Sequence, residues 1–175
     1  MKYRKIAQEI IQMAKLDQKI RKVYILKPTY LKKMKEADRL HLTKIIQIIK
    51  QIGWPTISRV GRKASHLAWL LIQHADNDIE FQEYCLGLMK KEVEGREVTK
   101  NDIAFLTDRI LVNKGMEQTY GTQFYRSKAG KLLPKPIKNI NSIDIRRKDM
   151  NMQSFSAYLK RTADFEKQVE SLRRK

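Results

Sequence analysis

Apolar residues recur at steps of three and four positions along most of this chain, which is the spacing of one face of an α-helix. In the first part of the chain they are Ile6, Ile10, Ile11, Met13, Ala14 and Ile20. Pro28 interrupts the pattern, which then resumes. Because only a short turn separates the two stretches, they predict two antiparallel helices over about residues 3–23 and 30–52.

Glycine, proline and capping residues mark the next helix boundaries. Gly53 and Pro55 end the second helix, because glycine favours a helix C-terminus and proline cannot continue the helix. A third helix is predicted over residues 60–75. Asn77 and Thr99 are suitable N-caps for a fourth helix that runs to about Val93 and a fifth that ends before Gly115.

The pattern of residue types changes after Gly115. Residues 119–125 favour a strand, residues 128–131 favour a turn, and Leu132 and Leu133 can form a returning strand. Shorter helices are predicted over residues 142–149 and 154–172. The fold class is therefore predicted to be mainly α: a single compact helical domain of about six to seven helices, with a small β-hairpin or ordered loop near 119–133.

Charge divides this single domain, residues 1–175, into three parts. The net charge is +18; residues 1–52 carry 14 Lys/Arg against 4 Asp/Glu, residues 53–126 carry 10 against 10, and residues 127–175 carry 13 against 5. We interpret these parts as a basic helical hairpin, a core that bears the motifs, and basic C-terminal helices. Clustered basic residues attract polyanions, so nucleic acid or an acidic protein is a candidate partner; solvated helix faces are the alternative.

Cysteine content and hydropathy limit the cellular compartment that we expect for the protein. The single cysteine, Cys85, excludes an internal disulfide and the multi-cysteine metal sites. Charged residues interrupt the N-terminal apolar positions, and no later stretch is apolar enough for a membrane span. We expect a cytoplasmic protein with no cofactor and no metal, although secretion without a cleaved signal would leave no mark in the sequence.

The stretch LLIQHADND, residues 70–78, ends an apolar helix in a group of polar residues. His74 follows the apolar stripe of that helix, so its imidazole should be partly removed from water, which suits a general base. A structural histidine that donates one hydrogen bond is the alternative. Asp76 is placed to orient His74, whereas Asp78 is expected to lie in the first turn of the next helix, where a carboxylate interacts favourably with the helix dipole; the combined H-x-D-x-D pattern is a weak metal signal.

A second polar group, Tyr120-Gly121-Thr122-Gln123, surrounds a glycine that can expose backbone N–H groups. Such a loop suits an anionic or amide-rich ligand, and it equally suits an ordinary tight turn. Arg109 is expected either to hold a phosphate or carboxylate or to form a surface ion pair. No nucleotide-binding loop and no familiar hydrolase motif is present.

Four motifs, in this order, resemble a bacterial family described as a domain of unknown function (number 6624). They are Gly53-Trp54-Pro55, Gln73-His74-Ala75-Asp76, Leu106-Thr107-Asp108-Arg109 and Tyr120-Gly121-Thr122-Gln123. The resemblance continues at Leu16-Asp17-Gln18, Arg21 and Asp38. It implies no established activity, but it favours a functional role for the polar motif residues. His66 does not match a fixed histidine of the family, so it is a weaker candidate.

We therefore predict a small enzyme, a hydrolase or transferase, that acts on a phosphate-containing or nucleotide-like anionic small molecule. The predicted catalytic residues are His74 as general acid/base, Asp76 and Gln73. The predicted substrate-binding residues are Tyr120, Thr122, Gln123, Arg109, Asp17, Gln18 and Trp54; Asp17 is the alternative to Asp76 for orienting His74. The competing hypothesis is a basic binding module in which the motifs form a structural polar network. The enzyme hypothesis requires the QHAD and YGTQ residues to meet in one pocket.

Overall fold

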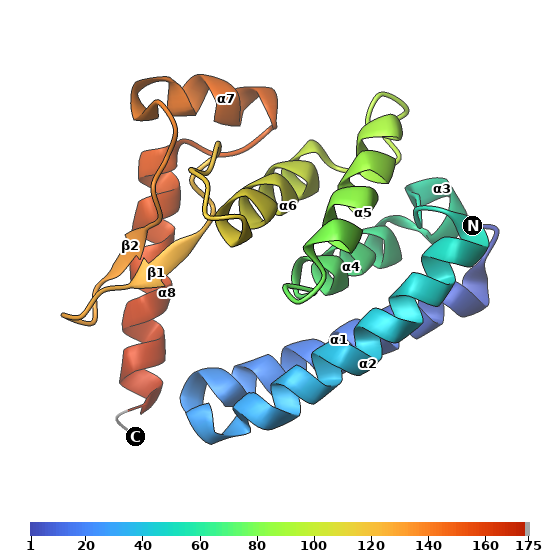
Figure 1. The fold of residues 1–175 in the computed structure, drawn as a ribbon, viewed down its shortest axis with the longest axis horizontal. Helices are drawn as coiled ribbons and strands as arrows, with labels where there is room; N and C mark the ends of the chain where they lie inside the picture. Colours follow the sequence, from blue (N-terminus) through green and yellow to red (C-terminus); the bar gives the residue numbers. More distant parts are fainter. Residues whose placement is uncertain (174–175) are drawn as a thin grey trace. The chain divides into compact units, whose positions relative to one another are not determined.

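The computed structural model describes residues 1–173 and is mainly helical (Figure 1). Its α-helices are α1 (Arg4–Leu26), α2 (Leu31–Ile52), α3 (Ile57–Val60), α4 (Arg62–Gln73), α5 (Ile79–Lys91), α6 (Lys100–Asn113), α7 (Ile143–Asp149) and α8 (Phe155–Arg173). Strands β1 (Phe124–Arg126) and β2 (Leu132–Pro134) form an antiparallel hairpin, and η1 (Pro28–Tyr30) and η2 (Ile140–Ser142) are short 3₁₀ helices. The predicted fold class is confirmed; the short α3 is a helix that the periodicity did not predict.

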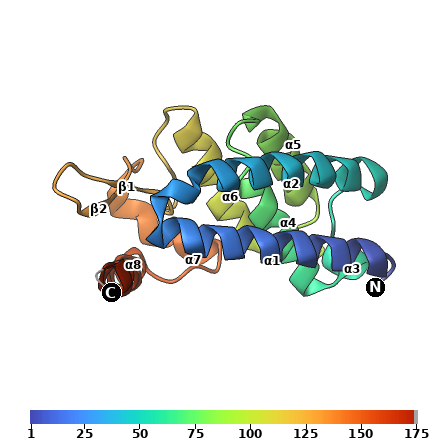
Figure 2. The same cartoon turned by 90° about the horizontal axis from the view of Figure 1, so that it is seen from below.

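Two compact units make up the chain, Met1–Asp102 and Ile103–Lys175. In the first unit, α1 and α2 run side by side in opposite directions, as Figures 1 and 2 both show. α4 packs against both helices. The packed faces are the apolar stripes of the sequence: Ile10, Ile45 and Ile72 have no exposed surface, so burial of these stripes is the main force that holds the three helices together.

The turn after α2 is closed by an arginine. Gly53 has φ +68°, and the guanidinium of Arg59 donates to the carbonyl of Trp54 over 3.2 Å. A side chain at Gly53 would lie 3.0 Å from that guanidinium. The indole of Trp54 is 2% exposed and belongs to the core, so this motif fixes how the chain leaves the helical hairpin.

Asp78 is the N-cap of α5, where the sequence predicted Asn77. Its carboxylate Oδ1 accepts the backbone N–H of Phe81 over 3.0 Å, a contact that satisfies one of the free amides at the helix start. The fully buried Gln82, one turn further on, donates to the carbonyl of Ile72 over 3.1 Å. This hydrogen bond ties α5 to the end of α4 and thereby fixes the position of the QHAD segment.

In the second unit, the hairpin pairs Phe124 with Pro134 and Arg126 with Leu132. The ring of Phe124 lies 5.7 Å from that of Tyr158, which attaches the hairpin to α8. The hairpin was predicted near 119–133, but residues 119–123 are not a strand, because their backbone amides bind a buried carboxylate described below.

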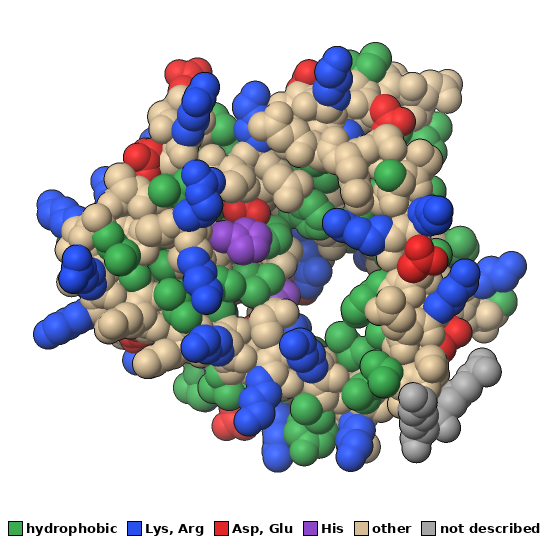
Figure 3. Space-filling model, turned by 180° about the vertical axis from the view of Figure 1, so that it is seen from behind, with side chains coloured by type: hydrophobic (Ala, Val, Ile, Leu, Met, Phe, Trp, Pro, Cys, Tyr) green, Lys and Arg blue, Asp and Glu red, His purple; other side chains and the backbone are tan. Residues whose placement is uncertain are grey.

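Among residues 1–173, no helix is both long enough and apolar enough to cross a membrane. Lys and Arg side chains project from many places on the molecular face drawn in Figure 3.

Gly121 lies at the most crowded glycine position of the second unit. Its φ is +71°, and a Cβ atom would lie 2.6 Å from the ring of Phe155 and 3.0 Å from Ile143. Gly130, in the hairpin turn, has a similar φ of +78°, but a Cβ there would meet nothing within 4 Å. A substitution at Gly130 thus tests backbone strain alone, whereas a substitution at Gly121 tests backbone strain together with steric crowding.

We expect Gly121→Ala to lower the free energy of unfolding by about 2 to 4 kcal/mol, because the new methyl group must displace the Phe155 ring as well as strain the backbone. Gly130→Ala should cost only about 1 kcal/mol, from backbone strain alone. Urea denaturation of both variants measures the difference; equal losses would contradict the close approach of Gly121 to Phe155.

Candidate functional site

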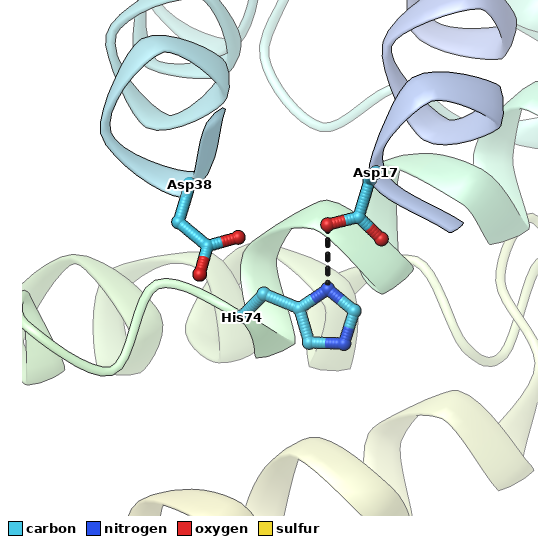
Figure 4. A group of neighbouring side chains, drawn as sticks. All are labelled: Asp17, Asp38 and His74. Atoms are coloured by element: carbon cyan, nitrogen blue, oxygen red, sulfur yellow. Dashed lines mark hydrogen bonds and ion pairs between the residues drawn. The ribbon is translucent and has the colours of Figure 1, made fainter. Parts of the chain in front are cut away.

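The imidazole of His74 lies at the C-terminal end of α4, where the backbone N–H of His74 donates to the carbonyl of Leu71 over 3.2 Å. Ring atom Nδ1 is 3.2 Å from Oδ1 of Asp17, which comes from α1; Asp38 of α2 completes the group (Figure 4). The side chain of His74 is 13% exposed and that of Asp17 only 1%. With its proton on Nδ1, the ring donates to Asp17, and the second ring nitrogen faces away from both carboxylates (Figure 4).

Arg21 joins the two carboxylates of this group. It lies one helical turn after Asp17, and its Nε donates to Oδ1 of Asp17 over 2.9 Å while its Nη2 donates to Asp38. Gln18 donates to the other oxygen of Asp17 over 2.8 Å. Asp17 thus receives hydrogen bonds from three side chains, which offsets the large cost of removing a carboxylate from water. Arg21 and Asp38 remain partly exposed, so the cluster reaches solvent.

The electrostatic environment distinguishes the two acids. Burial alone would raise the pKa of Asp17, but the hydrogen bond and charge of His74, together with Arg21, outweigh burial and lower it. Burial raises the pKa of Asp38; Arg21 opposes the rise and the charge of Asp17 adds to it. Asp17 is therefore the acid that stays ionised, and Asp38 is the one that takes up a proton more readily.

A second histidine lies close to this cluster. His41, one turn beyond Asp38 on α2, is 6% exposed, and its buried Nδ1 has no hydrogen-bond partner within the described residues 1–173. Burial lowers the pKa of His41, although the charges of Asp17 and Asp38 act in the opposite direction. The cluster is therefore flanked by an imidazole that favours the neutral form.

The same residues have the composition of a metal site. Asp17, Asp38 and His74 each present one atom within 4.8 Å of the others, and two carboxylates with an imidazole suit several divalent transition metals. The guanidinium of Arg21, however, already bridges the two carboxylates and supplies the compensating positive charge. A metal ion would have to displace it, so the arrangement favours a hydrogen-bonded acid–base cluster.

In the second unit, the YGTQ loop is built around Asp108 of α6, which has no exposed surface. Its Oδ1 accepts the backbone N–H groups of Thr119 and Tyr120 over 2.7 and 2.9 Å, and its Oδ2 accepts the N–H and the hydroxyl of Thr122 over 2.9 and 3.0 Å. Burial raises the pKa of Asp108, and these hydrogen bonds oppose the rise. Burial also raises the pKa of Tyr120. The N–H and hydroxyl of Thr122 therefore bind Asp108 within the loop, and a role of Thr122 in substrate binding stays a prediction.

The end of this loop is held by Gln118, another side chain with no exposed surface. Its Oε1 accepts the N–H of Gln123 over 2.8 Å, and its Nε2 donates to the carbonyls of Gln123 and Lys135 over 2.9 Å each. The side chain of Gln123 is half-buried, and its Oε1 lies 3.4 Å from Nη1 of Arg109. The amide Nε2 of Gln123 also donates to Oγ1 of Thr122 over 3.0 Å, so Gln123 and Arg109 belong to the same hydrogen-bonded cluster as the loop.

The other predicted site residues lie in different surroundings. Gln73 is the last residue of α4 and is half-buried, whereas Asp76 is exposed. The carboxylate that reaches His74 is that of Asp17, the alternative to Asp76 in the sequence prediction. Trp54 is buried in the core, and its role in substrate binding stays a prediction.

Arg21, Asp38 and Asp108 were not among the predicted site residues. Arg21 could have been found, because it lies four positions after Asp17 on a predicted helix and therefore on the same face. Asp38 and Asp108 belong to the segments that carry the family resemblance. The QHAD residues lie in the first unit and the YGTQ residues in the second; their meeting in one pocket stays a prediction.

Comparison with known proteins gives one result. A family described as "Family of unknown function (DUF6624)" matches residues 4–168. No curated protein and no solved structure matches the chain.

The lowered pKa of Asp17 predicts how stability depends on pH. A carboxyl group whose pKa is lower in the folded than in the unfolded state contributes stability above its unfolded pKa, and this contribution is lost as the pH falls through the folded pKa. We expect Asp17→Asn to lose about 3 kcal/mol at about pH 7, where Arg21 and His74 lose the negative charge of their shared acceptor. The difference from wild type should shrink towards about pH 3. Urea denaturation at both values measures this; a difference that is the same at both would contradict the ionised state of Asp17.

Proposed function

The chain belongs to the family of unknown function DUF6624, and from the chemistry of its own residues we propose that it is an acid–base enzyme centred on His74 and Asp17. The observation that carries the proposal is the contact between Nδ1 of His74 and the buried carboxylate of Asp17. A carboxylate in this position fixes the ring orientation and its tautomer, and it stabilises the imidazolium that forms when the other nitrogen takes a proton.

In this mechanism, Nε2 of His74 removes a proton from a water or hydroxyl nucleophile and later returns a proton to the leaving group. Asp17 holds the ring, and Arg21 and Gln18 hold Asp17. Because Arg21 bridges the carboxylates of Asp17 and Asp38, it fixes Asp17 and, through Asp17, the orientation of the imidazole. General acid–base catalysis requires such a fixed orientation.

We assign the substrate to the class of anionic, phosphate-containing or nucleotide-like small molecules. The net charge of +18 supports this class, because a basic surface raises the local concentration of anions. Within the proposal, Gln73 and Asp76 flank the reacting group. The reaction is hydrolysis or transfer of the group that the anion carries.

The test is a screen of phosphomonoesters, phosphodiesters and nucleotides by phosphorus NMR, followed by comparison of variants on the best substrate. His74→Gln should reduce kcat by about a hundredfold or more, because the amide cannot exchange the proton. His66→Gln, which removes a histidine outside this cluster, is the matched control and should keep the activity. If the screen yields a substrate and His74→Gln turns it over at the wild-type rate, the proposal is wrong.

A second candidate function is binding of a polyanion such as nucleic acid, or of an acidic protein, through the basic helical hairpin. All Lys and Arg residues of the segment 1–52 except Arg21 are exposed. The exposed residues include Lys32, Lys33 and Lys35, which lie together near the start of α2. Such a surface would attract a phosphate backbone without reading its sequence.

Salt dependence tests this second function. Binding to random-sequence duplex DNA should weaken steeply as salt rises. Replacing Lys32, Lys33 and Lys35 with glutamine should reduce the slope of log K against log salt by about one for each phosphate that the variant no longer neutralises. Fluorescence anisotropy measures both quantities. The absence of binding at low salt would exclude nucleic acid as the partner.

A further inference from the structure

A second histidine–carboxylate pair lies in the first unit, outside the cluster of His74. Nδ1 of His66, on α4, is 3.0 and 3.1 Å from the two carboxylate oxygens of Asp102. The side chain of Asp102 is 5% exposed, whereas that of His66 is 50% exposed. One side of the imidazole is therefore held by a buried acid, and the rest of the ring is open to water.

The ring of His66 is fixed from two directions. The backbone N–H of Asp102 donates to Oγ1 of Thr99 over 3.1 Å, so the acid stands in the capped first turn of α6. The imidazole also stacks on the indole of Trp69, with 4.9 Å between ring centroids and 28° between planes. Because Nδ1 faces Asp102, the nitrogen on the open side is Nε2.

Two basic residues are spaced to share the helix face of His66. Arg62 and Lys63 precede His66 by four and three residues on α4, a spacing that places side chains on the same face of a helix. Both are exposed. From this spacing we expect an anionic group that approaches His66 along this face to meet two cations.

We propose that His66 accepts a phosphoryl group on Nε2. The Nε2 lone pair forms a bond to the phosphorus of a small phosphoryl donor, such as a phosphoramidate or an acyl phosphate. The bond from phosphorus to the leaving group breaks, and the leaving group departs with that electron pair, as ammonia from the N-protonated phosphoramidate or as a carboxylate from an acyl phosphate. Asp102 holds the proton on Nδ1 and neutralises the positive charge that the ring acquires, while Arg62 and Lys63 attract the phosphate oxygens.

The other two histidines provide internal comparisons. The side chain of His74 is 13% exposed, and His41 is 6% exposed. Neither offers a nitrogen as accessible as that of His66, so a small donor should modify His66 first. The alternative role of the pair is purely structural: it would tie α4 to the first turn of α6 with no part in phosphoryl chemistry. The site does not depend on the proposed activity of His74.

The experiment incubates the full-length protein with potassium phosphoramidate at about pH 8.5. This pH is chosen because the hydrogen bond with Asp102 raises the pKa of His66, and Nε2 reacts only when it has lost its proton. Peptide mass spectrometry under alkaline conditions locates the label. We expect phosphate on His66, no label at this position in His66→Gln, and an unchanged rate at His66 in His74→Gln.

Asp102→Asn tests whether Asp102 acts by orienting the imidazole of His66, provided that the variant still folds. With far-UV circular dichroism equal to that of the wild type, labelling of His66 should be at least about tenfold slower; Asp102→Glu should recover part of the rate. If Asp102→Asn unfolds, the comparison is made with Arg62→Gln/Lys63→Gln, which should slow labelling by about threefold or more without affecting the core. The proposal is overturned if phosphate goes preferentially to His41 or His74, if the wild type labels no faster than a histidine-containing peptide, or if every folded variant except His66→Gln labels at the wild-type rate.

Discussion

A carboxylate that leaves water must receive hydrogen bonds or opposite charge, and this constraint organises both polar motifs of the chain. Asp17 meets it with the side chains of Arg21, Gln18 and His74. Asp108 meets it with backbone amides and the hydroxyl of Thr122. The difference matters for function. A carboxylate bound by side chains can share its charge with a group that titrates, whereas one bound by backbone amides fixes the path of a loop.

This contrast separates the roles of the two family motifs. The QHAD segment delivers a histidine to a buried acid and leaves the second ring nitrogen facing away from it (Figure 4). In the YGTQ segment, backbone amides and the threonine hydroxyl donate to Asp108. Its glycine, Gly121, leaves no room for a Cβ atom beside the ring of Phe155. The proposed acid–base activity rests on the first arrangement, whereas the second is a loop closed by its own hydrogen bonds, with the side chain of Gln123 next to that of Arg109.

The sequence predicted the longer helices well because they have a strong apolar period, and Pro28, Gly53 and Gly115 are clear stop signals. It predicted the N-cap of α5 one residue early, because Asn77 and Asp78 are equally good capping residues and only the geometry selects between them. The periodicity also placed His74 on an inward face, but it could not name the partner of His74. Asp17 is 57 residues away, and contacts over such distances depend on how the helices cross. Asp108 was missed because its partners are backbone amides, which every residue type except proline possesses.

The two buried acids also differ in how far along the chain their partners lie. Asp108 binds amides 11 to 14 residues away, so the closing of this loop costs little chain entropy and can occur early during folding. The contact of Asp17 with His74 requires α1 and α4, which are far apart in the chain, to have packed together. The acid–base pair is therefore a product of the completed tertiary structure, and an unfolded or partly folded chain, whatever helix it retains, would hold neither the acid nor the imidazole in a reactive position.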